Sequence, residues 1–420
     1  MASDRVLIVG GGLAGLCCAK ELSHKGIPFT LFEASDGWGG RVRTDEFEGF
    51  LLDRGFQVYL TAYPEGLRTL DYAALDFRAF KPGAMVRLAG AFQKLTDPWR
   101  VRGETLSTLT SPVGSFRDKL RLRALRSRLL RTPDEEILAA ENHTTMWLLK
   151  DCGFSPRMID RFFRPLMGGV MLDSSLLPSS RMFEFVFKMM ADGDTAVPAK
   201  GMGEIPKQLA SKLPSDSLRL NARVASIGDR SVTLESGETV PGAAVVLACE
   251  GPEAQRLAPA HLPPQRFRSV ACVYYTAPEP PIEGPWLVLN GNNQWPINNL
   301  AVMSEVSRDY APDGRALLSM SVLGKPSQTD DEVQRGVNSQ LMRWFGKDAK
   351  NWRHLRTYRI SYAQPDTVPE PLDRVSPRLA PGLYVAGDHR HMPSIHFAML
   401  SGRLAAESAI GDLTGVSATA

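Results

Sequence analysis

The feature that most constrains the fold of this chain is a glycine-rich turn between two short apolar runs near the N-terminus. Three glycines, Gly10, Gly12 and Gly15, have the spacing G-x-G-x-x-G and follow the first apolar run directly. Helical periodicity follows them, and a second apolar run comes next. Buried strand, glycine turn, helix and strand in this order predict a βαβ unit. We expect its elements at residues 5–9, 13–24 and 28–32.

Each glycine of the turn has its own physical reason. Gly10 permits the tight turn, Gly12 lets the backbone approach a pyrophosphate, and Gly15 allows helix and strand to pack closely. The helix begins at Leu13 and Ala14, and its free N–H groups would face the anion. The turn therefore predicts a dinucleotide-binding domain.

The second strand ends at Glu33, which Ala34 follows. A carboxylate at this position accepts hydrogen bonds from ribose hydroxyls and disfavours a 2′-phosphate. Both residues are therefore candidates for nucleotide contact. NAD and FAD share the adenosine ribose and the pyrophosphate, so this unit alone leaves the choice between them open.

Next along the chain comes the segment G-G-R-V-R-T, which opens with Gly39, Gly40 and Arg41. The glycines allow close backbone approach, and Arg41 can neutralise pyrophosphate oxygens through charge-assisted hydrogen bonds. A glycine turn with solvated arginines would have the same pattern. The segment resembles the second FAD signature, G-G-R-x-x-[ST], of the flavin amine oxidase superfamily, which includes monoamine oxidases, protoporphyrinogen oxidases and phytoene desaturases.

The resemblance extends to two segments further along the chain. The stretch around Gly55, Phe56 and Gln57 resembles the family's D-x-G segment, which implies flavin contact, although a strand-edge turn would look similar. The chain then returns to the first domain. Apolar and polar residues alternate in 218–227 and 231–234, as in the two strands of a hairpin. In related flavoproteins the residue matching Val224 holds the adenine end through backbone hydrogen bonds.

Near the C-terminus an apolar strand ends in Gly387 and Asp388, and a helix opens at Ser394 and Ile395. This pattern resembles the family's closing signature, strand-Gly-Asp followed by A-x-x-S-G. The resemblance implies that Asp388 contacts the ribityl and phosphate region. The N-terminus of the helix would stabilise the negative charge of reduced flavin.

The closing signature differs from the family pattern at one position, because Phe397 stands where relatives usually have glycine. No cysteine lies near this signature, so the resemblance implies non-covalent FAD. No second G-x-G-x-x-G is present, so a separate NAD(P)H site is not indicated. Both ends of the chain are thus expected to hold one FAD.

The expected fold class is α/β, with a glutathione-reductase-like FAD-binding Rossmann-type domain and a discontinuous α+β substrate domain. The first substrate-domain insert is expected to be mainly helical, and the second mainly sheet. We expect the FAD-binding domain at 1–80, 196–261 and 366–420, and the substrate-binding domain at 81–195 and 262–365.

Composition narrows the partners and the compartment. A net charge of +3 over 420 residues is too small to indicate a nucleic-acid partner. The five cysteines include no C-x-x-C pair, which favours a reducing, cytoplasmic compartment. No export signal and no apolar run of membrane-spanning length is visible.

One segment suggests contact with a membrane surface. Seven basic residues and one acid lie between Arg117 and Arg131, with Leu122, Leu125 and Leu129 on one helical face. Basic amphipathic helices lie on anionic membranes. A solvated helix whose leucines join a helical subdomain explains the same pattern.

Two clusters are candidates for substrate or proton handling. Aromatic and methionine residues at 162–171 and 182–190 would line an apolar pocket or form ordinary core. His389, His391 and His396 lie beside the closing signature, where local hydrogen bonding and proton transfer are both open. They have no acidic or cysteine partner at ligand spacing, so no metal site is expected.

The residues and the resemblance together favour dehydrogenation of a hydrophobic small molecule. Amine oxidases of the superfamily usually carry a lysine in the segment that matches 268–276, where this chain has none. We expect hydride transfer from a polyene, terpenoid or tetrapyrrole-like substrate to flavin N5, with reoxidation by oxygen or a quinone. An amine or amino-acid oxidase that releases peroxide and a non-catalytic flavin-binding protein are the alternatives, and no catalytic residue is identified.

Overall fold

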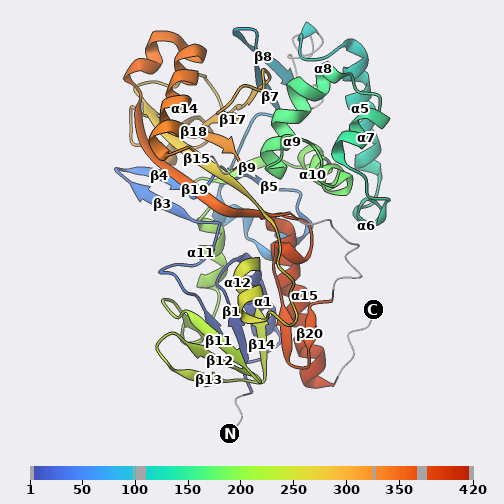
Figure 1. Ribbon diagram of the computed structural model, residues 1–420, viewed down its shortest axis with the longest axis vertical. Coiled ribbons are helices and arrows are strands. Elements are labelled where there is room, and N and C mark those ends of the chain that lie inside the picture. Colours follow the sequence, from blue (N-terminus) through green and yellow to red (C-terminus); the bar gives the residue numbers. More distant parts are fainter. Residues whose placement is uncertain (1–3, 98–99, 101–109, 325–327, 367–375, 416–420) are drawn as a thin grey trace.

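The computed structural model describes residues 4–97, 100, 110–324, 328–366 and 376–415. Figure 1 shows a lower part that contains the beginning and the end of the described chain, and a broader upper part. In the upper part a sheet with α14 beside it lies on one side and a group of helices lies on the other.

The lower part is built on a six-stranded sheet in the order β10-β2-β1-β14-β21-β20. Neighbouring strands are parallel except at the β20–β21 edge. Its strands are β10 (Leu218–Arg219), β2 (Phe29–Phe32), β1 (Val6–Val9), β14 (Ala244–Leu247), β21 (Leu383–Val385) and β20 (Arg378–Ala380). Parallel strands covered on both faces are continuous apolar runs, which explains why every residue of β1, β2 and β14 except Thr30 is apolar.

Successive residues of β1 enter different cores, because side chains alternate across a strand. Val6 and Ile8 pack with α1 (Leu13–His24) and α15 (Ile395–Thr414). Leu7 and Val9 pack on the other face. There they meet the three-stranded antiparallel sheet of β11 (Val224–Gly228), β12 (Ser231–Leu234) and β13 (Thr239–Pro241), together with α12 (Gly251–Leu257).

Two strand expectations in this region were wrong. The run 218–227 is two strands, because β10 pairs in parallel with β2 whereas β11 pairs with β12. The apolar run 240–249, whose composition predicts one buried strand, is also divided, into β13 and β14. Gly242 lies at that division, where a Cβ would stand 2.6 Å from Leu7 Cγ.

A seven-stranded mixed sheet organises the upper part, in the order β19-β15-β18-β17-β16-β7-β8. One face packs against α14 (Asp330–Phe345). The strands are β19 (Arg353–Pro365), β15 (Phe267–Ala277), β18 (Ala316–Leu323), β17 (Asn299–Val302), β16 (Leu287–Asn290), β7 (Gly83–Leu88) and β8 (Ala91–Thr96). The hairpin β7–β8 belongs to the insert that was expected to be mainly helical, yet it extends the sheet of the second insert.

The rest of that insert is helical in its described residues. Its helices are α5 (Phe116–Arg131), α6 (Asp134–Ala139), α7 (Thr145–Asp151), α8 (Pro156–Met158), the π-turn η1 (Ile159–Phe163), α9 (Arg164–Met171) and α10 (Ser180–Asp192). A capping box starts α5, in which Ser115 Oγ accepts from the Asp118 N–H and the Asp118 carboxylate accepts from the Ser115 N–H. Leu125 and Leu129 are buried within the core that includes α10.

The apolar stripe expected to touch a membrane is therefore divided, with Leu125 and Leu129 in the core and Leu122 only partly buried. Phe116 and Leu120 of α5 are instead 60% and 47% exposed. Among the described residues, every helix is too short or too polar to cross a bilayer.

The remaining elements of the described chain are short. The strands are β3 (Thr44–Phe47), β4 (Phe50–Asp53), β5 (Tyr59–Leu60), β6 (Phe77–Ala79) and β9 (Thr195–Pro198). The helices are α2 (Pro64–Thr69), α3 (Tyr72–Leu75), α11 (Glu204–Ser211) and α13 (Met303–Val306), with single turns η2 (Ser215–Ser217), η3 (Arg308–Tyr310), η4 (Gly346–Asn351) and η6 (Asp388–Arg390). The exact division of the chain into two domains stays a prediction.

Candidate functional site

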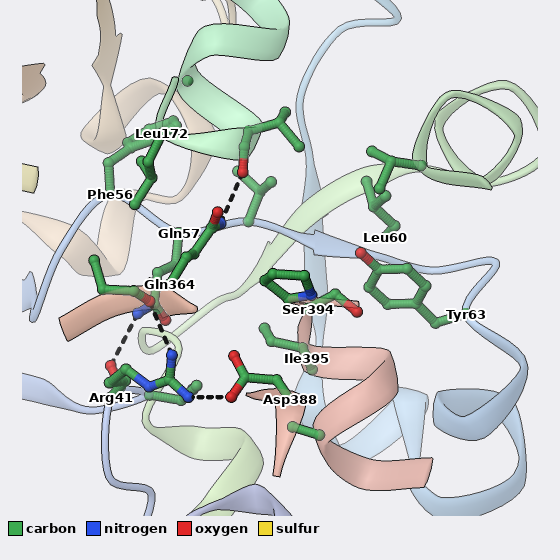
Figure 2. Close-up of a pocket in the computed structure, with 18 of the residues that line it drawn as sticks. Arg41, Phe56, Gln57, Leu60, Tyr63, Leu172, Gln364, Asp388, Ser394 and Ile395 are labelled. Carbon is green, nitrogen blue, oxygen red and sulfur yellow. Dashed lines mark hydrogen bonds and ion pairs between the residues drawn. The ribbon is translucent and has the colours of Figure 1, made fainter. Parts of the chain in front are cut away.

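A cavity of about 1280 Å³ begins at the glycine turn after β1 and continues between the seven-stranded sheet and the helical group. Pockets for drug-sized ligands usually measure roughly 300–1,000 Å³. The cavity therefore has room for a large cofactor and a second molecule. Figure 2 shows Arg41 and Asp388 facing each other at one side of it, with Tyr63 and Leu60 at another.

Nearly all residues proposed from the sequence for cofactor contact line this one cavity. They are Gly10, Gly12, Leu13, Ala14, Glu33, Ala34, Gly39, Gly40, Arg41, Phe56, Gln57, Val224, Gly387, Asp388, Ser394 and Ile395. Gly15 and Gly55 lie outside the lining. Residues from both ends of the chain thus share one cavity, and contact of each with a cofactor stays a prediction.

The glycine turn has the geometry that a pyrophosphate requires. Gly10 has φ +111°, a conformation that side chains rarely adopt. A Cβ on Gly15 would lie 1.9 Å from the Gly10 carbonyl oxygen, so Gly15 serves helix–strand packing. A Cβ on Gly12 would meet no protein atom within 4 Å. The open space beside Gly12, at the N-terminus of α1, fits the phosphates of a dinucleotide.

The carboxylate of Glu33 is held rigidly at the end of β2. Oε2 accepts from the Gly11 N–H at 2.7 Å, and Oε1 accepts from the Ser35 N–H at 2.8 Å and the Ser35 hydroxyl at 2.7 Å. Each carboxylate oxygen has more than one acceptor direction. Glu33 can therefore accept hydrogen bonds from ribose hydroxyls while its bonds to Gly11 and Ser35 stabilise the turn.

Arg41 and Asp388 form an ion pair that joins the two ends of the chain. Arg41 Nη2 lies 2.6 Å from Asp388 Oδ1, and Nη1 donates to the Ala363 carbonyl at 2.9 Å. The sequence suggested that each residue contacts the cofactor separately. Their pairing holds both beside the cavity and sets the positions of the second and the closing signatures relative to each other (Figure 2).

Helix α15 begins at the cavity wall. Ser394 Oγ accepts from the Phe397 N–H at 3.1 Å and caps the helix. Ser401 Oγ accepts from the Gly387 N–H at 2.9 Å, which ties the helix to the preceding strand. The partial positive charge of the helix N-terminus is thereby directed at the cavity.

The departure from the family pattern at Phe397 does not obstruct the cavity. The Phe397 ring is buried and packs against Phe185 with ring centroids 5.2 Å apart. Ala398 lines the cavity and Phe397 does not. The larger residue therefore fills the core behind the helix.

Gln57 presents an acceptor without a partner in the described structure. Its Nε2 donates to the Arg41 carbonyl at 2.9 Å, which fixes the amide orientation. Its Oε1 is buried and receives no hydrogen bond from a described residue. Because Gln57 lines the cavity, an N–H group of an isoalloxazine ring would satisfy this oxygen.

Sequence reasoning did not identify the role of the Asp53 side chain. Register pairs Thr44 with Asp53 in the β3–β4 hairpin, and the Thr44 hydroxyl donates to Asp53 Oδ1 at 2.5 Å. The Met202 N–H and the Tyr310 hydroxyl donate to the same carboxylate at 2.9 and 2.7 Å. The carboxylate thus links its own hairpin to two distant segments. The threonine nine positions before it, in the second FAD signature, was the available sequence signal.

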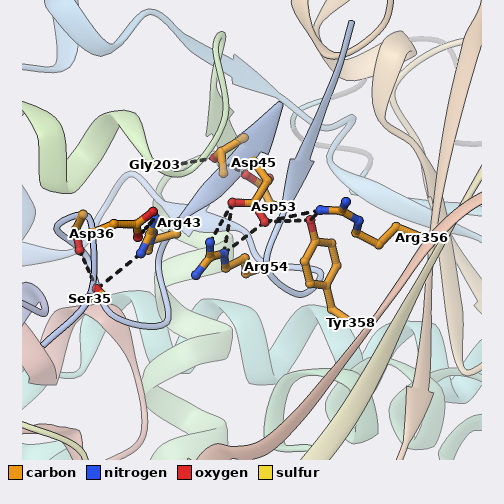
Figure 3. Close-up of polar contacts among 11 residues, drawn as sticks. Ser35, Asp36, Arg43, Asp45, Asp53, Arg54, Gly203, Arg356 and Tyr358 are labelled. Carbon is orange, nitrogen blue, oxygen red and sulfur yellow. Dashed lines mark hydrogen bonds and ion pairs between the residues drawn. The ribbon is translucent and has the colours of Figure 1, made fainter. Parts of the chain in front are cut away.

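A second polar cluster lies next to Asp53. The Asp45 carboxylate accepts from Arg54 Nη2 at 2.9 Å and from the Tyr358 hydroxyl at 2.8 Å. Figure 3 shows these side chains together, with Arg356 beside Tyr358. Strand β19 of the upper sheet is thereby fastened to the hairpin that follows the second FAD signature.

Replacing Asp53 by asparagine is expected to change how stability depends on pH. Burial raises the pKa of Asp53 to about 6, against an ordinary value of 3.8. The folded state therefore keeps a proton that the unfolded state loses, and stability falls as pH rises from about 4 to 6. This contribution is on the order of 3 kcal/mol.

An asparagine side chain at this position still accepts hydrogen bonds from Thr44 and Met202. The stability of the D53N variant should therefore not fall between about pH 4 and 6, and this variant should be more stable than the wild type at pH 7. Urea unfolding between about pH 4 and 8 measures the difference. Glu46→Gln, at an exposed position of the same hairpin, is the control and should follow the wild type. Parallel curves for wild type and D53N would contradict the prediction.

The three histidines near the closing signature are neutral and buried. Burial lowers the pKa of His389 and His391 to about 4 and that of His396 to about 3. His396 Nδ1 accepts from the Glu65 N–H at 3.4 Å. None of these histidines lines the cavity, and no group of three metal-ligating side chains occurs within the described residues.

The part of the cavity beyond the cofactor signatures is largely apolar. Its lining includes Leu60, Phe80, Phe162, Leu166, Leu172, Met182, Val186, Phe187, Met190, Leu287 and Leu289. Of the aromatic and methionine clusters expected to line a pocket or form core, Phe163, Met167, Met171 and Phe183 are core. Part of these clusters therefore lines the cavity, and the rest forms ordinary core.

Basic side chains surround part of the same cavity. Lys81, Arg100, Lys119, Arg123 and Arg126 belong to its lining. The nearby acid Asp97 accepts from Arg126 at 3.0 Å. Arg100 is likewise paired with Asp194, and the remaining basic side chains favour a ligand with acidic groups.

The parallel sheet, the open glycine turn and the joined chain ends together define a dinucleotide-binding flavoprotein. The family model of flavin-containing amine oxidoreductases matches residues 13–410. The chain belongs to this family and is an FAD-dependent oxidoreductase.

Named proteins with similar sequences include porphyrinogen oxidases. Protoporphyrinogen oxidase 2 of Arabidopsis thaliana is 22% identical over 501 aligned positions, which cover 99% of this chain and 96% of that protein. Coproporphyrinogen III oxidase of Propionibacterium freudenreichii is 26% identical over 171 positions, and the match spans 39% of this chain and 31% of that protein.

Solved structures share the fold over nearly the whole chain. A putative protoporphyrinogen oxidase from Exiguobacterium has a TM-score of 0.73 at 20% identity and covers 97% of this chain and 99% of that one. A putrescine oxidase has a TM-score of 0.69 at 16% identity, with 97% and 100% covered. The TM-scores establish the shared fold, and the low identities leave the substrate open.

Proposed function

We propose that the protein dehydrogenates an apolar small molecule of the polyene, terpenoid or tetrapyrrole-like class. The observation that carries this proposal is the continuity of one cavity, from the FAD signatures at Gly12 and Arg41 to an apolar chamber beside α10. Relatives named for protoporphyrinogen and for zeta-carotene-forming phytoene desaturation support the same substrate class.

The bound flavin would accept hydride at N5 and pass the electrons to oxygen or a quinone. The chain supplies the environment for this step. The N-terminus of α15, capped by Ser394, would stabilise negative charge on reduced flavin. Gly12 and Arg41 would hold the pyrophosphate, Glu33 the ribose, and the backbone of Val224 the adenine end. The apolar lining excludes water and orients the substrate.

Oxidation of an amine is the competing function, since a putrescine oxidase shares the fold. An amine substrate is a cation, and basic side chains around a site repel it. The lining of the chamber includes Lys119 and Arg123, and its acid Asp97 is neutralised by an ion pair with Arg126. The charge pattern therefore favours dehydrogenation of an uncharged or acidic substrate.

Contact with a membrane surface forms part of the proposal. Phe116 and Leu120 are exposed on α5 and also line the cavity. A basic helix with exposed apolar residues can bind anionic lipid, and its place at the cavity would suit delivery of a lipid-soluble substrate.

Anaerobic reduction of the bound flavin tests the proposed function. Mixing the holoenzyme with protoporphyrinogen IX, coproporphyrinogen III or phytoene should bleach the visible absorbance of the flavin with at least one of them. Vesicles containing anionic lipid should accelerate the reaction of the apolar substrates. Putrescine and benzylamine are the comparison substrates, and bleaching by amines alone would overturn the proposal.

A further inference from the structure

Asn299 places an amide on the cavity side of the upper sheet. In β17 it pairs with Leu289 of β16 and with Ser321 of β18. Its neighbour Leu300 points to the opposite face, into the core formed with α14. Since side chains alternate along a strand, Asn299 faces the chamber, and both Asn299 and Leu289 belong to the lining.

The orientation of this amide is determined by its neighbour. Asn298 Nδ2 donates to the Pro165 carbonyl at 2.9 Å and to Asn299 Oδ1 at 3.0 Å. The carbonyl of Pro165 can only accept, so Asn298 must present its NH₂ group there. Asn299 consequently turns its oxygen toward Asn298 and keeps Nδ2 for another partner.

No described residue accepts a hydrogen bond from Asn299 Nδ2. The residue is only 3% exposed, and the cavity lining around it includes Leu166 and Leu289. Leaving a buried donor unpaired is unfavourable by about 1–3 kcal/mol. Native proteins rarely leave such a donor unpaired, so a ligand or an ordered water is expected to supply the acceptor.

The backbone of α9 makes room for the arrangement. A Cβ on Gly169 would stand 3.0 Å from Asn298 Nδ2 and 3.1 Å from Asn299 Oδ1. Gly169 also lines the cavity. The two amides and the glycine form a built polar position beside the apolar side chains of Leu166 and Leu289.

We propose that Asn299 is a specificity-determining residue that donates a hydrogen bond from Nδ2 to an oxygen of the substrate. The substrate is then an apolar molecule that carries a carboxylate, carbonyl or hydroxyl group, and a pure hydrocarbon would leave the donor unpaired. The basic side chains of the same cavity favour a carboxylate among these. This inference rests on the proposed function and narrows its substrate class.

Binding to the oxidised holoenzyme tests the inference without turnover. The probes are coproporphyrin III, which carries propionate carboxylates, and phytoene, which is a hydrocarbon; flavin difference spectra and fluorescence quenching report binding. The variants are Asn299→Leu, which removes the donor at similar volume, and Asn299→Asp, which replaces it with an acceptor. Asn338→Leu and Asn338→Asp, on the exposed face of α14, are matched controls. FAD content and Tm establish folding of each variant.

We expect Asn299→Leu to bind coproporphyrin III roughly 10- to 100-fold more weakly than the wild type, and Asn299→Asp to bind it at least as weakly. Phytoene should bind to Asn299→Leu as tightly as to the wild type or more tightly. A structural defect would weaken both probes alike, so the opposite responses identify the hydrogen bond. Equal affinity of wild type and Asn299→Leu for coproporphyrin III would overturn the inference. Failure of coproporphyrin III to bind the wild type would also overturn it.

Flavin reduction by the wild type distinguishes this failure from failure of the proposed function. If phytoene reduces the flavin and neither porphyrinogen does, the assignment of Asn299 is wrong while dehydrogenation of an apolar substrate stands. If neither substrate class reduces it, the proposed function fails, and the binding ratios still decide the role of Asn299.

Discussion

Replacing Gly12 by valine should produce a folded protein that no longer binds FAD. A Cβ at this position meets no protein atom within 4 Å, and Gly12 has φ −72° and ψ −179°, a backbone conformation that valine adopts readily. The added methyl groups would occupy the space expected for the pyrophosphate. We expect the Kd for FAD to rise by at least about 100-fold, or about 3 kcal/mol.

Reconstitution of the apoprotein with FAD, followed by fluorescence quenching, measures this change. The Tm of the two apoproteins should agree, because the added Cβ points into open space, and this agreement is the internal control. A variant that is purified yellow with a full complement of FAD would show that the pyrophosphate lies elsewhere. A variant whose apoprotein is unfolded would contradict the structural basis of the prediction.

Replacing Gly402 by valine, unlike replacing Gly12, should destabilise the fold itself. Gly402 of α15 lies against α1, and a Cβ there would stand 2.0 Å from the Ala14 carbonyl oxygen. Backbone atoms cannot rotate away as a side chain can, so the two helices would have to separate. We expect a loss of about 3 kcal/mol or more, at the upper end of overpacking costs.

Thermal unfolding of the purified protein, followed by circular dichroism, measures the loss. Ser408→Val, at a half-buried position of the same helix, supplies the control for helix propensity and should cost less than about 1 kcal/mol. Because Ala14 lines the cavity, Gly402→Val should also weaken FAD binding. Similar unfolding curves for the two variants would refute the proposed close contact of α1 and α15.

Much of the fold was predictable because local chemistry specifies it. The run ending at Val9, the turn at Gly10 and the helix over 13–24 need only nearest-neighbour periodicity and glycine conformations to be recognised. The expected helix of 13–24 coincides with α1. The run 218–227 was assigned wrongly because β10 and β11 pair with different strands, one of them far away in the sequence, and pairing partners leave no local signal.

The candidate site was predictable only in outline. The motifs at both chain ends indicated one cofactor, but the Arg41–Asp388 pair between them spans 347 positions. Asp53 was expected to be part of a loop beside the flavin, whereas its carboxylate binds Thr44, Met202 and Tyr310. Asn299 belongs to no motif. Its proposed role depends on a buried donor, Nδ2, that no described residue pairs with.

The sequence by itself determined the cofactor class, because the phosphate-binding turn is local and requires glycines at set spacings. It also determined the order in which the chain leaves and re-enters the nucleotide-binding sheet. Only the tertiary structure decided which polar groups meet in the cavity and which remain unpaired. The physical reason is that burial and hydrogen-bond partners arise from contacts between distant segments, which no short stretch of residues encodes.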